Sequence, residues 1–247
     1  MLVLLPPSET KSAGGHDGPL DLEGLWLPEL TEVRSTLVDS LVALSDDMGA
    51  SRTALGLSPK QDDEIARNAE LTVSATRPAL ERYTGVLFDA LGARTFTRAQ
   101  QARARSRIAI GSALFGAVRA HDLIPAYRLS GGSSLPGLPT LRGLWKPHLA
   151  DSISAAADGV VVDLRSGAYR DLGPIPGAIT ATVLTEQPDG SRTVVSHFNK
   201  HHKGLLARAL TVTRAEPSDA RAVATVARKA GLTVEVASPT EVVVVTS

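Results

Sequence analysis

Residues 1–11 read MLVLLPPSETK, and this stretch sets the expectation for the whole fold. Residues 2–5 are apolar at every position, which is typical of a short strand buried on both faces of a sheet. A proline pair ends the run, and the segment from Ser8 to Lys11 then brings hydroxyls, a carboxylate and an ammonium. In α/β sheets, ligand sites lie where strands pass into loops at their carboxyl ends. The opening stretch therefore predicts a core strand followed by a polar ligand-binding loop.

The same arrangement is expected twice more along the chain. A predicted strand at 160–164 is followed by Arg165, Ser166, Tyr169 and Arg170, and a predicted strand at 193–198 is followed by Asn199, Lys200, His201, His202 and Lys203. Hydroxyls and cations of this kind bind phosphate or carboxylate oxygens. Each segment taken alone could also be a solvated loop end. The three together predict a site for an anionic ligand at one edge of the sheet.

The remaining patterns alternate between helices and strands. From Pro28 to about Gly49, leucine and valine recur every three or four residues, which predicts an amphipathic helix. Further helices are predicted after Ser58 and Thr97, and the stretch GSALFGAV predicts a tight turn from a strand into a helix. Residues 178–198 predict a hairpin around QPDGS. Because no composition break marks a boundary, we expect one α/β (mixed α+β) domain over residues 1–247, with a mixed central sheet, helices around it and a basic cleft at the strand ends.

The composition limits the possible functions. The chain has 247 residues, with 26 Lys and Arg against 26 Asp and Glu, so any nucleic acid must be bound by a local basic patch. It has no cysteine, which excludes disulfides, cysteine nucleophiles and thiolate metal sites within this chain. No apolar run approaches the roughly 18 residues of a membrane span, and the start lacks the features of a signal peptide. These features favour a soluble cytoplasmic protein that has no contact with a membrane.

The stretch FNKHHKGLLAR, at residues 198–208, has the highest concentration of cations at a predicted strand end. If Asn199 caps a helix, Lys200 and Lys203 lie in its first turns, where the helix dipole disfavours positive charge. That conflict indicates an anion-binding site. His201 and His202 would point about 100° apart on a helix, and no H-x-x-x-H spacing occurs, so we predict no metal site and no cofactor.

Glu9, Lys11 and Asp163 are candidates for acid–base chemistry. Carboxylates at the ends of adjacent strands can have their pKa values tuned for proton transfer. The set requires the strand at 2–5 to lie beside the strand at 160–164, which the sequence does not establish. Glu9 and Asp163 are the candidate catalytic residues on this hypothesis.

Several motifs, taken in order, resemble the YaaA family of peroxide-stress proteins. These are MLVLLPPSETK, RYTG, GSALFGAVRAHDLIPAYRLSGG, VVVDLRSGAY and VVSHFNKHHKGLLAR, which together cover about residues 1–213. The resemblance implies an α/β fold peculiar to the family, with a basic cleft, a helix-hairpin-helix element, DNA binding, and a role in limiting iron-driven oxidative DNA damage under hydrogen peroxide. It also implies that the cleft is lined by Lys11, Arg128, Lys200, Lys203 and Arg208, and we add Ser8 and Thr10 as phosphate-binding hydroxyls.

The chain departs from the family pattern at a few positions. His201 or His202 replaces a second basic residue, Ala120 and Ala126 replace usual family residues, and no Gly-x-Gly hairpin is present. Our first hypothesis is non-specific binding of double-stranded DNA through the cleft. The alternative is an enzyme acting on a nucleotide or nucleobase, which would bind a phosphate-bearing small molecule with Lys11, Arg128 and Lys200.

Overall fold

The computed structural model describes residues 1–194 and 196–246, with the side chains of 196–198 left out of the description. The first half of the chain contains β1 (Leu2–Leu5), η1 (Pro28–Leu30), α1 (Thr31–Leu44), α2 (Met48–Leu55), η2 (Pro59–Gln61), α3 (Asp62–Ala69), β2 (Arg77–Pro78), α4 (Ala79–Arg82), α5 (Val86–Leu91), η3 (Ala93–Thr95), α6 (Arg98–Arg107), β3 (Ile108–Ser112), β4 (Gly116–Arg119) and β5 (Leu123–Ile124). The second half contains α7 (Leu141–Trp145), α8 (Leu149–Ala156), β6 (Val161–Asp163), α9 (Gly167–Arg170), β7 (Ile179–Glu186), β8 (Arg192–Thr193), α10 (Ser196–Val212), α11 (Ala220–Lys229), β9 (Thr233–Ser238) and β10 (Glu241–Thr246).

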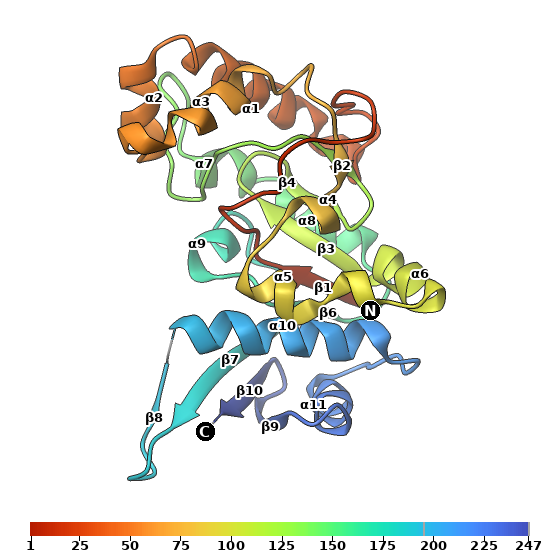
Figure 1. The fold of residues 1–247 in the computed structure, drawn as a ribbon. Helices are drawn as coiled ribbons and strands as arrows, with labels where there is room; N and C mark the ends of the chain where they lie inside the picture. Colours follow the sequence, from red (N-terminus) through yellow and green to blue (C-terminus); the bar gives the residue numbers. More distant parts are fainter. Residues whose placement is uncertain (195, 247) are drawn as a thin grey trace.

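A mixed sheet forms the centre of the molecule, as predicted, and the fold is α/β. Its strand order is β4-β3-β1-β6-β7-β10-β9, with β8 paired to β7. The five central strands β3, β1, β6, β7 and β10 are parallel to one another. The strand β4 pairs antiparallel with β3, and β9 pairs antiparallel with β10. Figure 1 shows α10 crossing the molecule beside α5, and α1 to α3 gathered at the end opposite β9 and β10.

β1 lies between β3 and β6, and all four of its residues are buried. Val3 pairs with Ile108 on one side and with Val162 on the other. Both faces of a parallel strand in this position are covered by other elements, which explains why the run is apolar at every residue. The structure therefore confirms the neighbourhood of the strands at 2–5 and 160–164.

Two predicted elements are wrong. The strand expected at 193–198 includes residue 195, which lies outside the described residues. Of its described residues, only Thr193 belongs to a strand, β8, and α10 begins at Ser196, so Lys200 and Lys203 lie in the first turns of a helix. The helix expected after GSALF is instead β4, which pairs antiparallel with β3. The turn into β4 requires Gly116, whose φ is +72° and where a Cβ would lie 2.8 Å from the ring of Trp145.

A buried arginine fixes the loop that follows β1. Arg82 is fully buried and donates to the carbonyl oxygens of Ser12, Gly14, Ala75 and Ile124. Because these carbonyls would otherwise be buried without partners, the guanidinium satisfies four acceptors with one side chain. The loop after Lys11 is thereby held against the β2–β5 ribbon, which sets the position of the polar residues just before it.

Within the part of the chain that the structure describes, no helix combines the length and the apolar character needed to cross a membrane.

Candidate functional site

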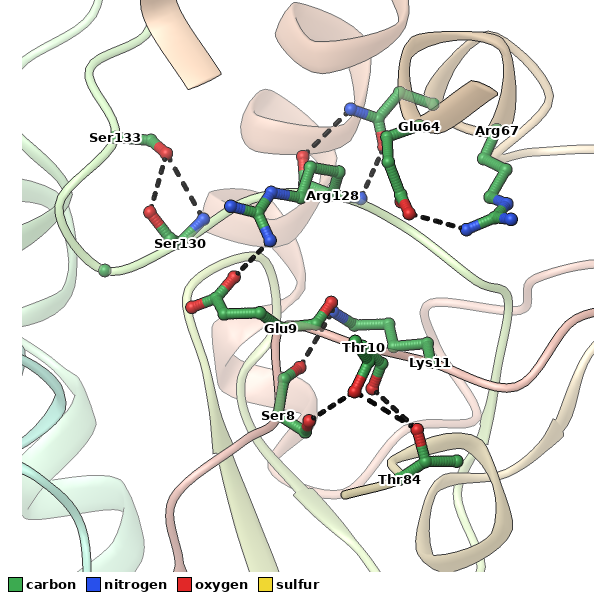
Figure 2. A network of polar contacts seen from close by, with 12 residues as sticks. Ser8, Glu9, Thr10, Lys11, Glu64, Arg67, Thr84, Arg128, Ser130 and Ser133 are labelled. Carbon is green, nitrogen blue, oxygen red and sulfur yellow. Dashed lines mark hydrogen bonds and ion pairs between the residues drawn. The ribbon is translucent and has the colours of Figure 1, made fainter. Parts of the chain in front are cut away.

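Polar side chains converge at the carboxyl ends of β1, β3 and β6. Because these strands are parallel, their carboxyl ends meet at one edge of the sheet. The segment 125–133, α9 and the turn before α5 bring further residues to this edge. We call the group the strand-end cluster; it consists of Ser8, Glu9, Thr10, Lys11, Tyr83, Thr84, Ser112, Tyr127, Arg128 and Tyr169, and several of these residues are drawn in Figure 2.

Lys11 lies at the centre of the strand-end cluster. Its Nζ donates to the carbonyl oxygens of Ser8 at 3.1 Å and Glu9 at 3.4 Å. The ammonium lies 4.1 Å from the centroid of the Tyr127 ring and 5.5 Å from that of Tyr83, within the range of a cation–π interaction. Burial lowers the pKa of Lys11 to about 8, because neighbouring groups only partly compensate the lost hydration. Lys11 is therefore an amine that changes protonation close to neutral pH.

A chain of hydroxyls lies beside Lys11. The hydroxyl of Tyr127 is 2.7 Å from that of Ser112 and 2.7 Å from that of Tyr83. Ser112 Oγ accepts from the backbone amides of Leu114 and Phe115, so its own proton is left for Tyr127, and either phenol can donate in the bond between Tyr127 and Tyr83. Burial raises the pKa of Tyr83 to about 12 and that of Tyr127 well above 10. Both phenols remain neutral hydrogen-bonding groups at physiological pH.

Glu9 connects two further segments to the cluster. Its Oε2 lies 2.9 Å from Nη1 of Arg128, and its Oε1 accepts a hydrogen bond of 3.3 Å from the hydroxyl of Tyr169. Figure 2 shows the Glu9 carboxylate and the Arg128 guanidinium pointing toward each other. The Arg128 backbone is held by the side chain of Asn68, which accepts from its amide at 2.7 Å and donates to its carbonyl at 2.9 Å. The pair is therefore positioned from α3 on one side and α9 on the other.

Three hydroxyls border Lys11 on its other side. Ser8 Oγ and Thr10 Oγ1 are 3.1 Å apart, and Thr84 Oγ1 donates to the carbonyl oxygen of Thr10 at 3.2 Å (Figure 2). Gly85 allows this approach, since its φ is +101° and a Cβ there would lie 3.4 Å from Ser8 Oγ. Ser8 and Thr10, both predicted from sequence, thus lie next to Lys11 with hydroxyls near the surface.

Asp163 has a structural partner. Its two carboxylate oxygens accept from Nε of Arg165 at 2.9 Å and from Nη2 at 2.8 Å, and both side chains are almost fully buried. The same guanidinium donates to the carbonyls of Tyr169 and Gly173. The structure therefore does not place Asp163 in an acid–base set with Glu9 and Lys11, although their strands are neighbours.

The cations of α10 separate into three environments. Lys200 is exposed. Lys203 donates to the carbonyl oxygen of Leu164 at 3.1 Å, and burial followed by repulsion from Arg170 lowers its pKa to about 8. Arg208 instead binds the end of α5, where it donates to the carbonyls of Leu91 and Gly92. Arg208 therefore caps a helix, and only Lys203 among the three contacts the segment that follows β6.

Tyr83 and Tyr127 are the part of the site that sequence reasoning missed, whereas Tyr169 was expected among the polar residues that follow the strand at 160–164. The chain has three tyrosines, and Tyr83, Tyr127 and Tyr169 all belong to the strand-end cluster. Each lies within one of the motifs RYTG, PAYRL and RSGAY, so their scarcity was a signal available in the sequence. Among the described residues, no group of three or more His, Asp or Glu side chains could hold a metal ion.

Comparisons with known proteins agree on one family. A family model described as "Peroxide stress protein YaaA" matches residues 1–235. A UPF0246 protein of Corynebacterium efficiens is 51% identical over 240 residues, which are 96% of this chain and 95% of the relative. UPF0246 proteins of Corynebacterium glutamicum and Streptomyces coelicolor are 46% and 42% identical, over 95% and 97% of this chain and 95% and 94% of their own lengths.

Proposed function

Because the chain belongs to the YaaA family of peroxide stress proteins, we propose that it acts in the peroxide-stress response by binding double-stranded DNA non-specifically at the edge that carries the strand-end cluster. Binding there would shield DNA from iron-driven oxidation. The observation that carries this proposal is the pair of partly buried amines at that edge, Lys11 and Lys203, neither of which forms an ion pair with a carboxylate among the described residues.

The lowered pKa values of these amines favour an anionic ligand. Burial lowers the pKa of Lys11 and of Lys203 to about 8, so keeping each charged costs free energy. A phosphate beside either amine would stabilise the charged form and raise its pKa again. Binding of a polyanion would therefore be accompanied by proton uptake, and it would weaken as the pH rises above 8.

Exposed cations supply the first contact with a phosphate backbone. Lys200 and Arg170 are both exposed, and Arg170 is close enough to Lys203 to lower its pKa. Since the formal net charge of the chain is zero, attraction to DNA depends on a local group of cations such as this one. Such binding comes mainly from phosphate contacts and counterion release, so it falls steeply with salt.

Fluorescence anisotropy with a labelled duplex, measured across a salt series, tests DNA binding. The variant Lys200→Ala/Arg170→Ala removes two exposed cations at the proposed edge, and Arg221→Ala/Lys229→Ala removes two exposed cations from α11 as the matched control. We expect the first variant to reduce the slope of log K against log salt by roughly one unit per cation, and the control to leave it unchanged. The absence of binding at about 50 mM salt, where phosphate contacts are stronger than at higher salt, would contradict the DNA proposal.

A second candidate function, an enzyme acting on a nucleotide or nucleobase, is favoured by the chemistry around Lys11. An amine with a pKa of about 8 lies within hydrogen-bonding distance of the Glu9 backbone and beside two neutral phenols. A group of this kind suits proton transfer near neutral pH. Arg128 would hold phosphate, and Glu9 would be the acid or base, since Asp163 is committed to Arg165.

Chromatography of nucleotides and nucleosides incubated with the protein tests the enzymatic candidate. Turnover should be present in the wild type, lost in Lys11→Met, and retained in Lys60→Met, which replaces an exposed lysine on η2. Turnover that survives Lys11→Met would remove Lys11 from the mechanism. Absence of turnover for every nucleotide would leave DNA binding as the function of the edge.

A further inference from the structure

A cavity of about 630 Å³ lies next to the strand-end cluster and has no role in the functions proposed above. It is enclosed by β2, α4, α5, η3, α6 and the turn after β4. Its volume is within the range of pockets that bind small molecules, roughly 300 to 1,000 Å³. Tyr83 and Thr84 form part of its wall, and the same two residues contact Lys11 and Thr10 on the other side.

The floor of the cavity is aromatic. Tyr83, Phe88 and Phe96 are all buried, and the rings of Tyr83 and Phe88 stack with centroids 5.6 Å apart and an interplanar angle of 18°. Small side chains, Ala104 and Ala120, complete the buried surface. A floor of flat rings and small side chains suits a planar ring, which stacks on aromatic faces with little regard to its identity.

The rim of the cavity carries charges of both signs. Arg94, Arg105 and His121 are exposed there, as are the carboxylates of Glu81 and Asp89. The lining as a whole has three arginines against two carboxylates. Within the described residues, neither Arg94 nor Arg105 makes a hydrogen bond or ion pair, so both guanidiniums are available to a ligand.

Arg77 adds a buried donor that lacks an acceptor. It lines the cavity, and its Nε is buried without a hydrogen-bond partner among the described residues. A buried unpaired donor costs roughly 1–3 kcal/mol, and an anionic group reaching the wall of the cavity would supply the missing acceptor. The observation is independent of the charges on the rim.

The geometry points to a binding site for a nucleobase that carries a phosphate, with the base on the aromatic floor and the phosphate among Arg77, Arg94 and Arg105. The ligand is either a free nucleotide or a base with its phosphate in single-stranded nucleic acid, because the two present the same chemistry. The site shares Tyr83 and Thr84 with the strand-end cluster but uses none of its cations, and it stands whether or not the protein binds duplex DNA.

Isothermal titration calorimetry of the full chain with adenosine monophosphate, adenosine and inorganic phosphate tests this site. Arg105→Glu reverses a charge on the rim, and Arg98→Glu is the matched control, because Arg98 is exposed on the same helix, α6, and does not line the cavity. We expect adenosine monophosphate to bind more tightly than adenosine or phosphate alone. We also expect Arg105→Glu to weaken its binding by about tenfold and Arg98→Glu by less than about twofold, since only a nearby charge contributes a contact.

Two further measurements decide the location and the source of the ligand. Ala93→Phe, which places a ring in the cavity, should abolish binding while the circular dichroism spectrum stays unchanged. An unlabelled single-stranded oligonucleotide that displaces adenosine monophosphate would identify nucleic acid as the source, and failure to displace it would identify the free nucleotide.

Three results would overturn the inference. One is the absence of binding by adenosine monophosphate at about 5 mM, a concentration at which even weak specific sites are occupied. Another is an equal effect of Arg105→Glu and Arg98→Glu. The third is binding that is lost in Lys11→Met but kept in Arg105→Glu, which would assign the ligand to the strand-end cluster. Duplex binding by the Lys200→Ala/Arg170→Ala variant tests the proposed function, and the nucleotide titration tests the cavity. Failure of the DNA proposal can therefore be told from failure of the cavity proposal.

Discussion

The ammonium of Lys11 lies 4.1 Å from the centroid of the Tyr127 ring, and its hydrogen bonds go to backbone carbonyls of its own loop. The contacts of this amine are therefore a ring face and neutral oxygens, with no carboxylate bound to it directly. Keeping the amine charged in such surroundings costs free energy, so it loses its proton at a lower pH than an exposed lysine does. The pH dependence of stability should reveal it.

The free energy of unfolding should rise between pH 8 and pH 10. The pKa values of Lys11 and Lys203 are lowered to about 8 from an ordinary value of 10.5. The unfolded chain therefore binds more protons than the folded chain in this window, so the free energy of unfolding increases with pH. We expect a rise of about 1–2 kcal/mol for each lysine, measured by urea unfolding. Lys11→Met should remove the part of this rise that Lys11 contributes, and the exposed control Lys60→Met should leave the rise unchanged. A free energy of unfolding that stays flat or falls over this pH range in the wild type would contradict the lowered pKa values.

Removing the charge of Asp163 should destabilise the fold strongly. Arg165 is buried and its charge is balanced by Asp163. Asp163→Asn leaves the guanidinium uncompensated, and breaking a buried pair in this way typically costs about 3–5 kcal/mol. Asp151→Asn, at an exposed position on α8, should change the free energy of unfolding by less than about 0.5 kcal/mol. Similar values for the two variants in chemical denaturation would show that the buried pair contributes little.

Glu9→Gln should increase affinity for DNA. The carboxylate of Glu9 is 2.9 Å from Arg128 and competes with any phosphate for that guanidinium. Removing its charge frees Arg128 and reduces repulsion of the ligand, so affinity in the anisotropy assay should rise by about threefold to tenfold at low salt. Glu32→Gln makes the same change at an exposed position on α1 and should have little effect. A loss of affinity in Glu9→Gln would mean that Glu9 orients Arg128 for binding.

Gly204→Ala should destabilise the contact between α10 and α5. A Cβ at this position would lie 2.7 Å from the Cβ of Ala90 and would also collide with the carbonyl oxygen of Leu87. Because backbone must move to relieve the clash, we expect a loss of about 1–3 kcal/mol. Gly167→Ala is the control, since nothing lies within 4 Å of the added methyl group. A gain in thermal stability for Gly204→Ala would show that the helices separate easily.

The strands that are covered on both faces of the sheet could be predicted from the sequence. Residues 2–5 are a continuous apolar run and residues 160–162 are three valines, and both stretches enter buried strands of the parallel centre of the sheet. Local capping was also predictable: Thr97 Oγ1 accepts from the amide of Gln100, and the Gln100 side chain accepts from the amide of Thr97. In these cases a short-range pattern is sufficient, because the interactions that fix the structure lie within the pattern itself.

The errors arise where distant residues decide the structure. A short apolar run such as TVV fits a strand or a helix equally well, and the chain enters α10 at Ser196 because the helix buries its apolar face against α5. The turn at Gly116 is set by Trp145, which is far away in the sequence.

The site could be predicted only in outline. Ser8, Thr10 and Lys11 lie together at one edge, as their positions after the first strand indicate, and Arg128, which only the family resemblance implied, lies there with them. The partners of Arg208 and Asp163 could not be predicted from the sequence. Arg208 binds the end of a helix at Gly92, and Asp163 pairs with the buried arginine just after its own strand; both contacts depend on how the fold packs. The three tyrosines likewise come from separate segments of the chain, and only the folded structure brings these segments together.

The position of β1 between β3 and β6 has a consequence for the way the chain is made. Val3 leaves the ribosome early, but its partner Ile108 follows about 105 residues later and Val162 about 160 residues later, which at 5–20 residues per second amounts to roughly 8–30 s for the second partner. Until β3 emerges the apolar strand has no neighbour, and until β6 emerges one of its two edges stays unpaired. Nascent chains should therefore be held by chaperones until β6 emerges, and stalling translation between β3 and β6 should yield a product that aggregates.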